Sequence, residues 1–200
     1  MSTPLSTLAA PFRHEEEIKK SRFIAQAAAV TTPADALAFF QAVGDPGATH
    51  NCWAYRIGDA YRFNDDGEPG GTAGRPILAA IDGQGCDRVA VVVTRWYGGI
   101  KLGAGGLVRA YGGSAAECLR LAPRVPIIAV GRIALRADFS DLALISARIR
   151  ELDGTIEEEH FVADGADLIV SAPLDQLDAI TARIIDTTRG RTTPKRLDPL

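Results

Sequence analysis

The chain has 200 residues, of which 46% are hydrophobic and 24% are charged, and its formal net charge at pH 7 is −3. This composition is typical of a folded globular protein and argues against a disordered chain. The small negative charge excludes uniform electrostatic coating of nucleic acid or of an anionic membrane, so any such contact needs a local basic patch. No apolar run reaches the roughly 18 residues of a membrane span, and the N-terminus lacks a basic flank before an apolar core. We therefore expect a cytoplasmic protein with no membrane partner.

The three cysteines, Cys52, Cys86 and Cys118, are widely spaced and form no C-x-x-C pair. An odd number at this spacing indicates neither a disulfide framework nor a zinc site, and we interpret all three as small core residues. The three histidines are also too scattered along the chain to indicate a metal site. The sequence therefore predicts no metal and no cofactor.

The first predicted elements are two strands followed by a helix. Charged side chains and then an apolar run over residues 15–30 are typical of an edge strand and a second strand. Thr32 and Pro33 mark the start of the helix, and the turn-forming segment 44–47 marks its end.

A further strand is predicted over residues 48–57, which places His50 and Cys52 on the same face. One interpretation of these two residues is a Cys–His nucleophilic pair. We favour a structural or hydrogen-bonding role for His50, because adjacent strand positions seldom give the required hydrogen bond.

A polar loop rich in turn-forming residues is predicted over residues 62–76. Two interpretations fit Asp65, Asp66 and Glu68: they hold a divalent cation, or they accept backbone hydrogen bonds in turns and at a helix start. Their spacing does not match a calcium-binding loop, so we favour the hydrogen-bonding role. Pro76 is typical of the first turn of a helix, so the loop is expected to end at a helix entrance.

The most informative stretch covers residues 95–111. A β-branched run over 89–93 precedes it and apolar residues at helical spacing follow, so we predict a strand, a glycine loop and a helix. A glycine inside a helix costs about 1 kcal/mol relative to alanine, which favours placing Gly103, Gly105 and Gly106 in the loop or the first helical turn. Such a junction attracts anions, because a helix start carries unpaired N–H groups and glycines allow close approach.

We predict that this glycine loop and the polar loop before it form one concave anion-binding site. The predicted anion- or RNA-binding residues are Arg75, Arg95, Tyr97, Gly98, Gly99, Lys101, Gly103, Gly105, Gly106 and Arg109. The predicted cleft-lining residues are His50, Asn51, Asp65, Asp66, Glu68 and Thr72. The glycines also fit a purely structural role in tight turning and helix packing. No catalytic residue is predicted, because the loop matches neither G-x-x-x-x-G-K-[ST] nor G-x-G-x-x-G.

Two prolines in the segment 122–126 predict a linker between a first domain, residues 1–122, and a second domain, residues 127–200. The expected elements of the second domain are a strand over 127–137, a helix over 141–152, strands over 155–162 and 167–172, a helix over 175–186 and a strand over 191–197. Their order, β-α-β-β-α-β, predicts a ferredoxin-like domain. This domain shows no catalytic constellation.

Four long motifs stand out in the first domain. They are KKSRFIA from Lys19, HNCWAY from His50, DDGEPGGTAG from Asp65 and RWYGGIKLG from Arg95. Together they resemble the IMPACT/YigZ family, and the resemblance covers residues 15–121. The second domain looks like that of the bacterial YigZ-type members.

The resemblance implies an α+β protein of two domains. The first domain is expected to be similar to the second domain of ribosomal protein S5, a β-sheet with helices on one side. The second is expected to be similar to the last domain of elongation factor G. Eukaryotic IMPACT proteins are translational regulators that restrain the amino-acid-starvation kinase by competing for its activator, and they carry an extra N-terminal domain that this sequence lacks. No accepted reaction comes with the family.

We therefore expect a non-enzymatic binding protein linked to the regulation of translation. Its expected partners are RNA or the ribosome, or a translation-regulatory protein, contacted through the glycine-rich cleft. The alternative is an enzyme or small-ligand binder that recognises a phosphorylated metabolite or a nucleotide in the same cleft, with His50 as the acid or base and the carboxylates on a cation.

Overall fold

The computed structural model describes residues 5–197, and the chain divides into two compact units between Ile127 and Ile128. The first unit contains β1 (Ser6–Leu8), β2 (Phe12–Ile18), β3 (Ser21–Ala29), α1 (Pro33–Val43), β4 (His50–Ile57), β5 (Ala60–Asn64), α2 (Gly74–Gly83), β6 (Val89–Trp96), α3 (Ala104–Leu121) and β7 (Arg124–Pro126). Five strands form an antiparallel sheet in the order β2-β3-β6-β4-β5. A separate antiparallel pair joins β1 to β7.

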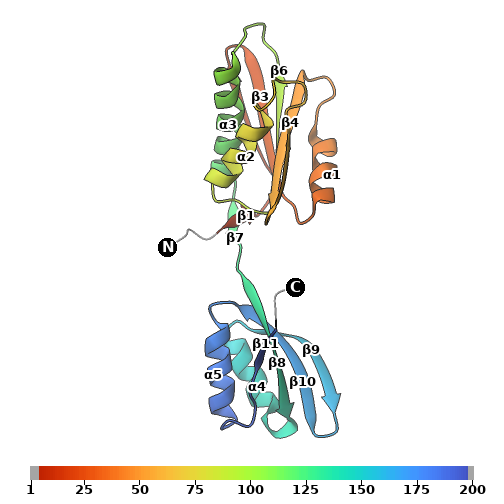
Figure 1. The fold of residues 1–200 in the computed structure, drawn as a ribbon, viewed down its shortest axis with the longest axis vertical. Helices are drawn as coiled ribbons and strands as arrows, with labels where there is room; N and C mark the ends of the chain where they lie inside the picture. Colours follow the sequence, from red (N-terminus) through yellow and green to blue (C-terminus); the bar gives the residue numbers. More distant parts are fainter. Residues whose placement is uncertain (1–4, 198–200) are drawn as a thin grey trace. The chain divides into compact units, whose positions relative to one another are not determined.

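Helices cover both faces of the five-stranded sheet (Figure 1). The central strand β6 is buried on both faces: Val91 and Val93 pack in the core with α2 and α3, whereas Ala90 and Val92 pack with Phe40 of α1. A strand alternates its side chains between faces, so a continuous apolar run is what two buried faces require. The expectation of helices on one side is therefore correct for α2 and α3 and wrong for α1.

The helix starts follow the local sequence. In α1 the Thr32 hydroxyl accepts a hydrogen bond from the Asp35 amide and the Asp35 carboxylate accepts from the Thr32 amide, which is a capping box. Helix α3 begins at Ala104, directly after Gly103, whose φ of 71° suits a glycine. The prediction that the glycines at 103, 105 and 106 lie in the loop or the first turn is confirmed.

Three strands of the first unit, β1, β5 and β7, were not predicted. Strand β5 was not predicted, because all of its residues are exposed and it lacks alternating buried side chains. The segment expected to be a linker contains β7, whose Val125 pairs with Thr7 of β1. Residues 124–126 therefore belong to the first unit.

The second unit contains β8 (Val130–Asp138), α4 (Phe139–Glu151), β9 (Thr155–Val162), β10 (Gly165–Pro173), α5 (Leu177–Thr187) and β11 (Lys195–Leu197). Its antiparallel sheet has the order β11-β8-β10-β9, and α4 and α5 cover one face (Figure 1). Every second side chain along β8 is buried in the core, namely Ile133, Leu135 and Ala137. This topology confirms the predicted ferredoxin-like domain. No helix within residues 5–197 is both long enough and apolar enough to cross a membrane.

Candidate functional site

A cavity of about 410 Å³ lies in the first unit where β4, the loop after β5, the end of β6 and the start of α3 come together. We call it the glycine-loop pocket. Its lining consists of Thr49, His50, Glu68, Pro69, Arg95, Tyr97, Lys101, Leu102, Gly103, Ala104 and Leu107. The pocket therefore brings together residues from both of the loops that the sequence singled out.

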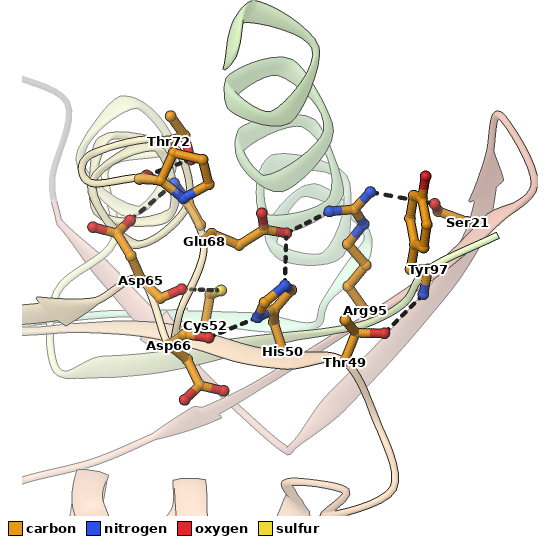
Figure 2. Close-up of polar contacts among 12 residues, drawn as sticks. Ser21, Thr49, His50, Cys52, Asp65, Asp66, Glu68, Thr72, Arg95 and Tyr97 are labelled. Atoms are coloured by element: carbon orange, nitrogen blue, oxygen red, sulfur yellow. Dashed lines mark hydrogen bonds and ion pairs between the residues drawn. The ribbon is translucent and has the colours of Figure 1, made fainter. Parts of the chain in front are cut away.

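The wall of the pocket is built on a buried ion pair between Glu68 and Arg95, which are 9% and 5% exposed (Figure 2). An Arg95 guanidinium nitrogen donates to Glu68 Oε1 at 2.6 Å, and the Tyr111 hydroxyl donates to the same oxygen at 2.7 Å. A second guanidinium nitrogen lies 3.4 Å from Ser21 Oγ, while Arg95 Nε has no hydrogen-bond partner among residues 5–197. Because buried charges need partners, Glu68 is what holds the Arg95 guanidinium in place.

His50 is held in one orientation by the polar loop. Its Nδ1 lies 2.7 Å from the backbone oxygen of Asp66, and its Nε2 lies 3.8 Å from Glu68 Oε1 (Figure 2). A carbonyl oxygen only accepts hydrogen bonds, so Nδ1 must carry a proton. Nε2 is the ring nitrogen that faces Glu68 at the pocket wall.

The carboxylates of the polar loop accept backbone hydrogen bonds. Asp65 accepts from the amides of Gly71, Ala73 and Gly74 at 2.8–3.0 Å and so fixes the start of α2, and Asp66 accepts from the Asn51 amide. The favoured turn and helix-cap role is confirmed for Asp65 and Asp66. It is wrong for Glu68, whose carboxylate accepts from the side chains of Arg95 and Tyr111. Both carboxylate oxygens of Asp65 accept these N–H groups, and within the described residues no three His, Cys, Asp or Glu side chains are grouped to hold a metal ion.

Other predicted site residues lie outside the pocket lining. Asn51 and Asp66 line a different cavity, of about 510 Å³, between α1 and the sheet. The Thr72 hydroxyl donates to the Pro69 carbonyl and serves the loop itself. The remaining predicted residues that do not line the pocket are Asp65, Arg75, Gly98, Gly99, Gly105, Gly106 and Arg109.

The structure brings six of the predicted residues into one pocket: His50, Glu68, Arg95, Tyr97, Lys101 and Gly103. Sequence reasoning missed Thr49, whose hydroxyl accepts from the Tyr97 amide, and Tyr111, whose hydroxyl donates to Glu68. Thr49 directly precedes the motif HNCWAY, and this position is a weak sequence signal. The sequence contains no signal for Tyr111, because its partner Glu68 lies 43 residues away.

Cys52 lies beneath the polar loop, and its thiol donates to the Asp65 carbonyl at 3.0 Å. Burial raises the pKa of the Cys52 thiol to about 12, and burial does the same for Cys118 in the helix α3 core. Because the thiolate is the nucleophilic form, Cys52 is unsuited to nucleophilic catalysis near neutral pH. Cys52 bonds to the Asp65 carbonyl, whereas His50 bonds to the Asp66 carbonyl. The two side chains therefore have different partners, which favours structural roles for both.

We expect Cys52 and Cys118 to resist alkylation in the folded protein. At pH 8 a thiol with a pKa of about 12 is a thiolate in about one molecule in ten thousand, so iodoacetamide should label both only after unfolding in urea. The raised pKa also means that the unfolding free energy falls as the pH rises from about 9 to 12, because the unfolded state loses the proton first. Rapid labelling of Cys52 in the native protein, read by peptide mass spectrometry, would contradict this account.

Comparison with known proteins matches both units. Residues 19–119 match the family model of the Impact N-terminal domain, and residues 135–191 match a domain of unknown function, DUF1949. An IMPACT family member in the pol 5′ region of Thermus thermophilus is 46% identical over 177 residues, covering 87% of this chain and 97% of that protein. IMPACT family member YigZ of Escherichia coli is 39% identical over 189 residues, covering 91% and 92%.

A solved structure agrees with these relatives. A crystal structure described as that of a hypothetical protein matches with a TM-score of 0.73 and 35% identity, over the whole of both chains. The long motifs, the match to the Impact N-terminal domain and the full-length bacterial relatives all point to the same family. The chain belongs to the IMPACT family.

Proposed function

We propose that this protein is a non-enzymatic binding protein of the translation system, which contacts RNA phosphates through the glycine-loop pocket. The observation that carries the proposal is that Lys101, Arg95 and the start of α3 line a single pocket. The first turn of α3 has no side-chain cap, so its N–H groups are not satisfied by the N-cap residue. Unpaired helix-start N–H groups and a lysine are what a phosphate group needs.

The balance of charge in the pocket makes Lys101 the main cation available to a ligand. The Arg95 charge is compensated by Glu68 at 2.6 Å, whereas Lys101 is exposed. Membership of the IMPACT family carries a link to translation, since eukaryotic IMPACT proteins are translation regulators. We place this role in the cytoplasm, where translating ribosomes supply the RNA.

A second candidate is a small phosphorylated ligand, such as a nucleotide, in the same pocket. The observation that favours it is the volume of about 410 Å³, which is in the usual range for small-molecule sites. A thermal-shift screen with nucleotides and phosphorylated metabolites tests it, because a ligand that binds the folded state raises the melting temperature. No shift with any compound would leave RNA as the only candidate of the two.

We expect Lys101→Ala to weaken RNA binding and to flatten its salt dependence. Removing one phosphate contact should reduce the slope of log affinity against log salt by about 1. Fluorescence anisotropy with a labelled RNA and with purified ribosomes measures both quantities. Lys195→Ala is the matched control, because Lys195 is an exposed lysine of the second unit. Equal losses in the two variants, or an affinity that does not respond to salt, would contradict the proposal.

A further inference from the structure

The lining of the glycine-loop pocket is divided by charge. Lys101 and the start of α3 offer positive charge and N–H donors, whereas Glu68 offers a carboxylate and His50 a ring nitrogen. Because Glu68 and Arg95 compensate each other's charge, a phosphate is expected to lie at Lys101. The Glu68 and His50 side of the pocket suits a neutral hydrogen-bond donor, such as a ribose hydroxyl or a base amino group.

An aromatic ring completes the lining. Tyr97 is 45% exposed, and the Arg95 guanidinium carbon lies 5.4 Å from the centre of its ring. The neighbouring Trp96 also lies under a guanidinium, that of Arg22 at 4.9 Å, but it is less exposed than Tyr97 and does not line the pocket. Tyr97 is therefore the ring that can offer an accessible face to a nucleobase. Stacking of this kind is how proteins hold unpaired bases.

We propose that the pocket holds one unpaired nucleotide of an RNA strand. Its base stacks on Tyr97, its phosphate lies at Lys101 and the start of α3, and a sugar or base donor bonds to Glu68. This inference rests on the proposed function and names the form of RNA that the site takes. A volume of about 410 Å³ admits a single nucleotide, and the bases of a duplex are already stacked and paired, so a duplex cannot deliver one to Tyr97.

The test compares two RNAs of the same sequence, one single-stranded and one annealed to its complement, by fluorescence anisotropy on the full chain. We expect the single strand to bind at least about tenfold more tightly than the duplex. Tyr97→Leu should weaken single-strand binding about tenfold and leave the salt slope unchanged, because stacking releases no counterions. Tyr97→Phe keeps the ring and should bind as the unchanged protein does.

The outcomes separate this inference from the proposal on which it rests. Equal affinity for both RNAs, with Tyr97→Leu unaffected and Lys101→Ala still weakened, would overturn the unpaired-nucleotide inference and leave RNA binding in place. Absence of binding to either RNA would overturn both. Tyr97 is exposed, so both variants are expected to fold, and their tryptophan emission checks this first. A loss of RNA affinity in Tyr97→Leu that Tyr97→Phe shares would also overturn the stacking role.

Discussion

Replacing Glu68 with leucine is expected to lower the free energy of unfolding of the first unit by about 3–5 kcal/mol. The substitution leaves the Arg95 guanidinium, which is 5% exposed, without its counter-charge at 2.6 Å. It also leaves the buried Tyr111 hydroxyl without its acceptor. Removing one partner of a buried ion pair costs far more than the pair contributes, because the remaining charge stays in a medium of low polarisability.

Urea unfolding followed by tryptophan emission measures the stability of the first unit, because both tryptophans, Trp53 and Trp96, lie in that unit. The matched control is Glu117→Gln, which removes an exposed carboxylate paired with Arg120 and should leave the urea midpoint close to that of the unchanged protein. The double variant Glu68→Leu with Arg95→Met should recover much of the loss, since it leaves no unpaired charge. A cost for Glu68→Leu no greater than the control would contradict the buried pair.

Gly98→Ala is expected to destabilise the first unit by about 3 kcal/mol, at the upper end of overpacking costs. A Cβ at this position would lie 1.7 Å from the Lys20 carbonyl oxygen and 2.0 Å from its carbon, so backbone rather than a flexible side chain must move. Lys20 sits with Lys19 in the tight turn between β2 and β3, where both residues have positive φ angles. The turn has little freedom to adjust, because left-handed backbone is already unfavourable for lysine.

Gly70→Ala is the control for this substitution, because no described atom lies within 4 Å of a Cβ built there. It should leave the urea midpoint close to that of the unchanged protein. Since Gly98 directly follows Tyr97, the clash should also displace the aromatic side of the pocket. A Gly98→Ala protein as stable as Gly70→Ala would show that the close approach between these two backbone segments is wrong.

Local sequence signals predicted most of the fold because the relevant physics is local. The capping residues of α1, the glycines before α3 and the alternation of the second unit each act within one turn or one strand. The elements that were missed depend on distant partners. Pairing of Thr7 with Val125 and the exposed strand β5 leave no trace in a short window of sequence.

In the candidate site, too, residue types could be predicted from the sequence, whereas contacts between distant residues could not. Tyr97 and Lys101 were predicted as anion-binding residues and Glu68 as a cleft-lining residue, and the pocket contains all three. Which charges are free was not predictable, because Arg95 meets Glu68 across 27 positions of the chain. The structure changes Arg95 from a free cation into a compensated one and so gives Lys101 the larger role.

RNA is expected to enter the glycine-loop pocket of the first unit. Ultraviolet crosslinking of the full chain to single-stranded RNA containing 4-thiouridine, followed by trypsin digestion and mass spectrometry, tests it most directly. We predict that the crosslinks concentrate on the tryptic peptide of residues 96–101, which carries Tyr97 and Lys101. Crosslinks confined to residues 128–200 of the second unit would contradict the claim.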